Sequence, residues 1–169
     1  MKKLFSLILM MCISLLFLKI VYADNHDNNA ITIVKQKGKK KYIPELKQVR
    51  LVDGEVTLSN GKIEKGIFEY IPESESMALV DGEITFPNGS IQKGKRAYIP
   101  ELKQVRLVNG EATFPDGTFL KGTFEYFPEL KKMRLVDGEA TFPNGKIDKG
   151  IFEYIPELKQ VRLVDGEIT

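Results

Sequence analysis

Few side chains in this sequence of 169 residues have the chemistry needed for catalysis. Its one histidine, His26, and its one cysteine, Cys12, both lie near the N-terminus. A catalytic triad or a usual zinc site needs several such side chains held together. The sequence therefore predicts no catalytic residue, no metal ligand and no cofactor-binding residue, and we expect a protein that is not an enzyme and uses no cofactor.

The most frequent group of candidate oxygen ligands is the tripeptide Asp-Gly-Glu or Asn-Gly-Glu. It begins at Asp53, Asp81, Asn109, Asp137 and Asp165. A calcium loop needs ligands at alternate positions within about 12 residues, whereas successive copies in a sheet would stand about 10 Å apart, two strand spacings. We therefore expect each glutamate to pair with a lysine on the neighbouring strand, for example Glu55 with Lys65, Glu83 with Lys93 and Glu111 with Lys121.

The N-terminal residues have the organisation of an export signal. Lys2 and Lys3 precede the apolar run Leu4 to Leu18, and Val21-Tyr22-Ala23 fits a signal-peptidase site. We predict a signal peptide over residues 1–23, with cleavage after Ala23. An uncleaved membrane anchor is the alternative, but the run is shorter than the ~20 residues that span a bilayer.

Export places the protein outside the cytoplasm. We expect it to be secreted, or to lie in the periplasm or cell envelope, meeting a membrane only through the signal peptide or by peripheral contact. Residues 24–34 are polar and Asn-rich at their start, which predicts a flexible lead-in.

The charge of the mature chain is close to zero. The leader carries three of the 25 basic residues and no acidic one, so 22 basic residues face 23 acidic ones, a net charge of −1. A nonspecific binder of nucleic acid needs a strong positive field. We therefore predict no nucleic-acid partner.

The rest of the chain is an internal repeat with a period of 28 residues. Besides the Asp-Gly-Glu copies, the period carries the tyrosines Tyr42, Tyr70, Tyr98, Tyr126 and Tyr154, and the glycines Gly38, Gly66, Gly94, Gly122 and Gly150. Such a period is typical of stacked repeats that bury apolar surface against their neighbours. Residues 35–169 therefore form one elongated domain of about four and a half units, the last one incomplete.

Each unit reads as a β-hairpin. In the fourth unit, Leu135 to Phe142 and Lys146 to Tyr154 flank Pro143-Asn144-Gly145, a tripeptide suited to a three-residue loop. Counting from this loop opposes Phe142 to Lys146, Thr141 to Ile147, Glu139 to Lys149, Gly138 to Gly150 and Val136 to Phe152. Repeated over all units, the pattern predicts an all-β fold, a single-layer antiparallel meander of about ten strands with a row of glycines across it.

These positions resemble a MORN repeat, which combines a glycine, a turn ending in Asp/Asn-Gly, a further glycine and an aromatic residue. In the fourth unit the match is Gly138, Asn144-Gly145, Gly150 and Phe152. The period of 28 is longer than the family's, and Glu64, Gln92, Leu120 and Asp148 replace the family's tyrosine. The resemblance implies a non-enzymatic scaffold that binds a protein or an envelope component.

Aromatic side chains that recur at fixed spacing are the candidate binding surface. They are Phe68, Phe124, Phe152, Tyr70, Tyr98, Tyr126 and Tyr154. A single-layer ribbon cannot bury both of its faces, so we expect a stripe of these rings to bind a partner or a second copy. Lys95-Arg96-Ala97 stands where another unit has Ile-Phe-Glu and should interrupt the stripe.

The two ends of the repeat differ in charge. Lys35, Lys37 and Lys39 to Lys41 make the first strand strongly basic, which suits a capping edge strand or a docking patch for anions. The last strand, Val161 to Thr169, stops before the turn that would follow it. Truncation and use of the edge both explain this, and the second gives an alternative function, a self-assembling structural surface protein joined through its open C-terminal edge strand.

Overall fold

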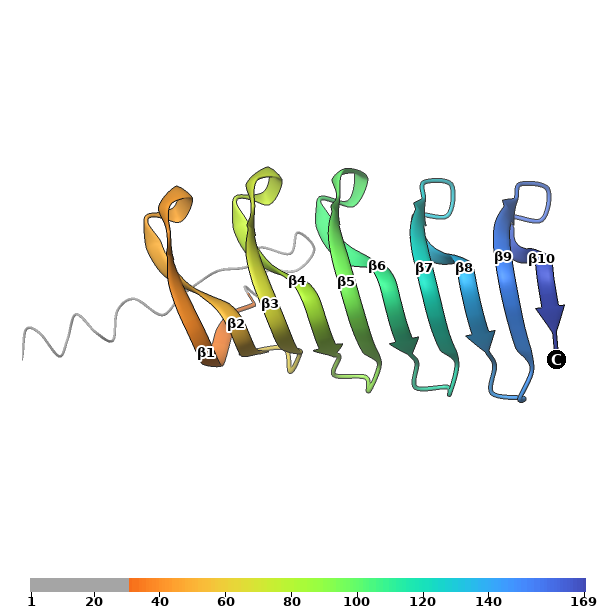
Figure 1. Cartoon of the computed structure of the whole chain (residues 1–169), viewed down its shortest axis with the longest axis horizontal. Helices are drawn as coiled ribbons and strands as arrows, with labels where there is room; N and C mark the ends of the chain where they lie inside the picture. Colours follow the sequence, from red (N-terminus) through yellow and green to blue (C-terminus); the bar gives the residue numbers. More distant parts are fainter. Residues whose placement is uncertain (1–30) are drawn as a thin grey trace, which may run out of the picture.

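The computed structural model describes residues 31–169, which form one antiparallel sheet of ten strands that follow one another in sequence order (Figure 1). The strands are β1 (Ile33–Ile43), β2 (Gln48–Leu58), β3 (Ile63–Ile71), β4 (Ser76–Thr85), β5 (Ile91–Ile99), β6 (Gln104–Thr113), β7 (Phe119–Phe127), β8 (Lys132–Thr141), β9 (Ile147–Ile155) and β10 (Gln160–Ile168). The predicted all-β, single-layer meander is confirmed. The leader with its cleavage site after Ala23, as well as Cys12 and His26, lies outside the described residues.

The sheet begins earlier than the repeat pattern indicated. β1 starts at Ile33, so the lead-in predicted over residues 24–34 overlaps the first strand. The Thr32 N–H donates to Ser59 Oγ at 3.0 Å, and the Ser59 N–H donates to the Thr32 carbonyl at 2.8 Å. Ile31 and Ile33 pack against buried side chains. These contacts and hydrogen bonds hold residues 31–33 against the sheet.

Short turns join each even-numbered strand to the next odd-numbered one. In the turn after β8, the Phe142 N–H donates to the Lys146 carbonyl at 2.8 Å, and the Gly145 N–H donates to the Phe142 carbonyl at 2.9 Å. Asn144 Oδ1 accepts the Lys146 N–H at 3.1 Å, and Gly145 takes the left-handed φ of 83°. The predicted three-residue loop is confirmed.

Three of the five other turns contain a single turn of 3₁₀ helix, at Pro44–Leu46, Pro72–Ser74 and Pro100–Leu102, and we call all five 3₁₀-type turns because the same hydrogen bond closes them. The residue after Pro44–Leu46 is Lys47, whose φ is 50° and whose N–H donates to the Pro44 carbonyl at 3.1 Å. The same bond closes the last two of these turns, at Lys131 and Lys159. This second link between strands is therefore a tight, hydrogen-bonded turn.

The two kinds of turn join strands that pair over different lengths. Strands joined by the 3₁₀-type turn pair over eight to ten residues, whereas strands joined by the short turn pair over five. β8 and β9 pair only from Asp137–Ile151 to Thr141–Ile147, which includes the predicted pairs Glu139–Lys149 and Gly138–Gly150. The predicted pair Val136–Phe152 is wrong, because the pairing of β8 with β9 ends at Asp137–Ile151, and Phe152 pairs only on its other side, with Leu163 of β10.

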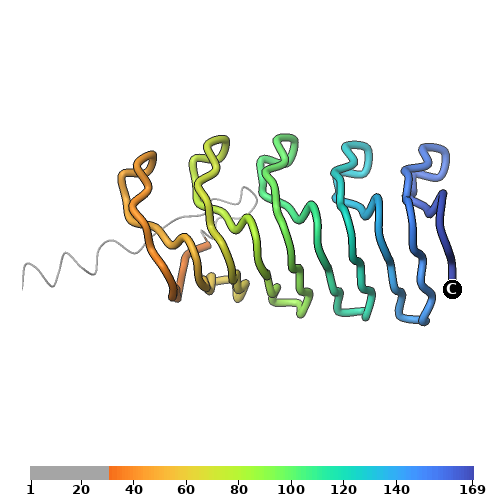
Figure 2. Tube along the Cα trace, viewed as in Figure 1, coloured from red at the N-terminus to blue at the C-terminus, as the bar shows by residue number. Residues whose placement is uncertain are grey.

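A bend line across the sheet explains this difference. Ten glycines, one from each strand, face one another across the sheet. Each even-numbered strand also has a β-bulge two residues before its glycine, as at Val136 of β8, where β8 pairs with β7. A bulge turns the strand and increases its twist. Beyond this line the hairpins stand apart from one another (Figure 2), so β8 no longer meets β9.

One face of the sheet, which we call the inner face, holds the buried apolar side chains in two clusters. The first contains Ile43, Leu51, Val56, Leu58, Phe68, Met77, Leu79 and Ile84, and the second contains Leu107, Ala112, Phe124, Leu135, Ala140 and Phe152. They are separated at β5, where Arg96 and Gln92 occupy the inner positions. The predicted interruption of the aromatic row by Lys95-Arg96-Ala97 is therefore confirmed.

Candidate functional site

The three phenylalanines predicted to line a binding surface lie in the core. Phe68, Phe124 and Phe152 are 4%, 6% and 7% exposed. Each lies opposite a leucine of the next strand, as Phe124 does opposite Leu135 of β8. The expectation of an exposed phenylalanine stripe is therefore wrong, because the bend of the sheet closes its inner face over these rings.

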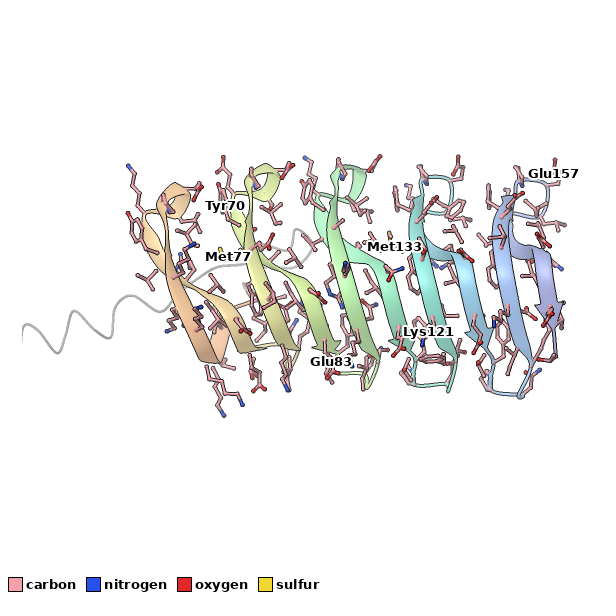
Figure 3. All side chains as sticks on the ribbon, in the orientation of Figure 1. Tyr70, Met77, Glu83, Lys121, Met133 and Glu157 are labelled. Atoms are coloured by element: carbon pink, nitrogen blue, oxygen red, sulfur yellow. The ribbon has the colours of Figure 1, made fainter. Side chains whose placement is uncertain are left out.

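The four tyrosines of the predicted surface stand on the same face, two residues further along each odd-numbered strand. Tyr70, Tyr98, Tyr126 and Tyr154 are all half-buried. Tyr70 lies opposite Met77, a pair that Figure 3 labels on β3 and β4, and the ring of Tyr154 lies 5.9 Å from that of Phe127. The structure therefore brings the tyrosines together in one row, with part of each ring accessible.

The inner face also carries a groove of about 530 Å³ over β7 to β10, which we call the C-terminal groove. Its apolar lining consists of Leu120, Leu130, Leu135, Ala140, Phe142, Phe152, Val161, Leu163 and Ile168. Its charged lining consists of Arg134, Lys146, Lys159, Arg162 and Asp148. The groove is therefore apolar with a net positive lining.

A smaller groove of about 160 Å³ lies over β1 to β4, between Leu46, Leu51, Phe68 and Met77 among others. Sequence reasoning missed both grooves, because it assigned no contact with the sheet to Leu46 and Leu130, which belong to turns. A signal was present, since this leucine recurs in the Pro-Glu-Leu tripeptide of four turns. An apolar residue kept in an exposed turn indicates a contact with the sheet.

Arg96 is the buried cation between the two clusters. Its Nη1 donates to Gln92 Oε1 and its Nη2 to the Gln92 carbonyl, both at 3.2 Å. Within the described residues its Nε is buried without a hydrogen-bond partner. Burial lowers the pKa of Arg96 to about 10, Glu64 opposes this shift, and Arg106 adds to it. Arg96 is therefore charged at neutral pH, which makes β5 the polar strand of the inner face.

Two acidic residues on the inner face are held by lysines two residues earlier in the sequence, in the short turns that precede their strands. Lys62 Nζ lies 2.8 Å from Glu64 Oε1, and Lys146 Nζ lies 2.9 Å from Asp148 Oδ1 and 3.0 Å from Asp148 Oδ2. Asp148 is buried in the C-terminal groove. Lys146 neutralises it, so the other three cations of the groove give it its positive character.

The opposite face, the outer face, carries a row in which lysine and glutamate alternate across all ten strands. In strand order the row is Lys37, Glu55, Lys65, Glu83, Lys93, Glu111, Lys121, Glu139, Lys149 and Glu167. Of the predicted ion pairs, Glu111–Lys121 forms at 3.1 Å, whereas Glu55 pairs with Lys37 at 3.3 Å. Figure 3 labels Glu83 and Lys121 in this row.

Among residues 31–169, no three His, Cys, Asp or Glu side chains lie close enough together to hold a metal ion. Over the same residues, no helix has the length and apolar composition needed to cross a bilayer. No protein-family model and no curated protein matches the chain.

Proposed function

We propose that the protein is an exported, non-enzymatic repeat scaffold of the MORN-like kind, which binds a partner protein or another envelope component in the C-terminal groove. The observation that carries this proposal is the groove itself. It has a volume of about 530 Å³ and a largely apolar lining, and it lies on the open face of a single-layer sheet. Concave apolar surfaces with a few placed polar groups are the usual form of binding sites.

The lining supports a particular kind of ligand. Among residues 31–169, Arg134, Lys159 and Arg162 are cations of the groove that form no ion pair like the one between Lys146 and Asp148. An extended segment with apolar side chains and carboxylates would cover the leucines and pair with these cations. The half-buried Tyr154, which lies opposite the lining residue Val161, adds an amphipathic ring beside the groove.

Two matched variants test the binding surface. Leu130→Glu places a negative charge in the groove, whereas Ile151→Glu makes the same change on the outer face at a side chain that is 40% exposed. We expect a partner captured from envelope extract by the wild type to be kept by Ile151→Glu and lost by Leu130→Glu. Circular dichroism checks that both variants fold, and equal capture by all three proteins would contradict the proposal.

The export part of the proposal has its own test. We expect the protein recovered from the periplasm or the medium to begin at Asp24, as measured by intact mass. Recovery of a chain that still begins at Met1, in the membrane fraction, would favour the uncleaved anchor.

A further inference from the structure

We propose that copies of this chain associate head to tail, with β1 of one copy added to the open edge of β10 of the next. The contact would use the register of the short-turn junctions inside the sheet. This inference does not require a ligand in the groove, with whose lining it shares Ile168. It concerns the two edge strands of the described sheet, β1 and β10.

The backbone of β10 offers hydrogen-bonding groups at its open edge. Thr169 and Ile147 exchange both of their backbone hydrogen bonds, at 2.9 and 2.8 Å. In an antiparallel ladder the bonding direction alternates from residue to residue. The N–H and C=O groups of Gly166 and Ile168 therefore point away from β9, toward the side where the described sheet has no further strand.

The side chains at this edge show the same lack of a neighbour. Ile168 is 61% exposed, whereas the residues at the corresponding positions of the preceding units, Ile84, Ala112 and Ala140, are 7%, 3% and 4% exposed. In those units the next odd-numbered strand covers the position, as β9 covers Ala140 through Asp148. An added strand would bury Ile168 in the same way.

β1 has the features of the strand that follows an even-numbered strand. Its residues Lys35 to Lys39 correspond, four periods earlier, to Ile147 to Ile151 of β9. Placed beside β10 in the register of β8 and β9, Gly38 lies opposite Gly166, and Gln36 lies opposite Ile168. Five residue pairs would form, as many as in each internal short-turn junction.

Charge selects this arrangement over the other edge pairings. The register places Lys37 of one copy opposite Glu167 of the next, and Lys39 opposite Asp165, so the alternating row of the outer face continues without a break. Pairing two β1 edges would bring lysines together, and pairing two β10 edges would bring acidic residues together. The basic edge of β1, which discourages pairing with other strands, is therefore complementary in charge to the acidic edge of β10.

Head-to-tail contacts are heterologous, and such contacts extend into open chains unless their rotation closes a ring. A contact of five residue pairs is smaller than the ~800 Å² per partner of a standard interface, so association should be weak. The test is analytical ultracentrifugation of the full chain as an expression host exports it, from about 10 µM to 1 mM. We expect the mean mass to rise continuously with concentration and to fall with added salt.

Four variants make the test specific. Glu167→Lys should weaken association about tenfold or more, whereas Glu157→Lys, the same charge change in the turn at the other end of β10, should leave it unchanged (Figure 3). Glu167→Lys combined with Lys37→Glu should restore association, because opposite charges face each other again. Ile168→Pro removes an N–H that points to the open edge and no bond to β9, so it should abolish association.

Thermal unfolding checks that each variant is folded as stably as the wild type. A wild type that stays monomeric at 1 mM, or that stops at a closed dimer, would overturn the proposal. So would a folded Glu167→Lys/Lys37→Glu protein that associates no better than Glu167→Lys alone.

Discussion

Two sets of glycines serve different purposes in this sheet. Gly122, in the bend line, has φ 144°, and a Cβ added to it would lie 2.0 Å from the carbonyl oxygen of Asp137. Gly117, in a short turn, has φ 86°, and a Cβ there would meet nothing within 4 Å. The first glycine is required by close contact with the next strand as well as by its dihedral angle, and the second by its dihedral angle alone.

The two glycines therefore predict different costs. Gly122→Ala should lower the free energy of unfolding by about 3 kcal/mol or more, since backbone atoms must move apart. Gly117→Ala should lower it by about 1 kcal/mol, the strain of a left-handed alanine. Urea unfolding of the two variants measures both values, and equal losses would show that the close contact does not matter.

One of the short turns has a titratable residue at a position where the others have asparagine. Asp116 takes the place of Asn60, Asn88 and Asn144, and its Oδ1 accepts the Thr118 N–H at 2.9 Å. The hydrogen bonds from the Thr118 backbone and side chain lower the pKa of Asp116 below its usual 3.8. Because the folded state favours the ionised form, this turn is stabilised above that pH and loses the stabilisation as the pH falls.

We expect the Thr118 amide to respond to acid and the Ser90 amide, which Asn88 holds at 3.0 Å, to stay constant. Amide chemical shifts recorded by NMR from pH 6 down to about pH 2 measure this, across the range where aspartate titrates. In Asp116→Asn the response of Thr118 should vanish. A response that persists in this variant would assign it to another group.

At the scale of the elements, β5 differs from β3, β7 and β9 in its inner-face residues. Arg96 occupies the inner position that phenylalanine holds in β3, β7 and β9, and it separates the two apolar clusters. Replacing a buried charge by a well-packed apolar side chain is often neutral or stabilising. The polar β5 therefore lowers the stability that the repeat could reach.

Arg96→Phe should raise the free energy of unfolding by about 1–3 kcal/mol, because it buries an aromatic ring and removes a desolvated cation. The matched control is Lys95→Ile, which also restores the residue of other units but on the outer face, where the change should be within about 0.5 kcal/mol. Urea unfolding measures both. A less stable Arg96→Phe protein would show that Arg96 makes contacts that stabilise β5.

Features of the sheet that depend on neighbouring residues in the sequence could be predicted, whereas features that depend on contacts between distant strands could not. The loop Pro143-Asn144-Gly145 and the pairs next to it follow from turn chemistry and from the two-residue period of a strand, so they were predicted correctly. The bulge at Val136 was not predicted, although the adjacent apolar residues Leu135 and Val136 interrupt the two-residue alternation of the strand at this point. The end of β8–β9 pairing at Asp137–Ile151 was not predicted either, because it depends on the bend of the sheet, and the expected pair Val136–Phe152 lies just beyond it.

The candidate site was less predictable than the fold. Repetition identified Phe124 and Phe152 as important residues, but repetition is expected of core and of surface positions alike. The bend decided between them by closing the inner face over the rings. Leu130 reaches the groove only because its turn folds toward the sheet, a tertiary contact that no spacing in the sequence reports.

At the scale of the whole molecule, the two faces of the sheet have different tasks. The inner face holds the apolar clusters and the grooves, and the outer face holds the alternating row of lysine and glutamate from Lys37 to Glu167. The proposed ligand uses the first and the proposed association uses the second with the edge backbone. The two contacts meet at Ile168, which lines the groove and would be buried by the added strand.

The alternation of long and short strand pairing also makes the sheet a chain of mechanical links. Each hairpin closed by a 3₁₀-type turn is paired over eight to ten residues and is held to the next by five. Under tension between the chain ends, hairpins should detach one by one, each releasing one 28-residue period, or roughly 90 Å of extended chain. Single-molecule stretching should record evenly spaced ruptures, whereas one rupture for the whole sheet would contradict this expectation.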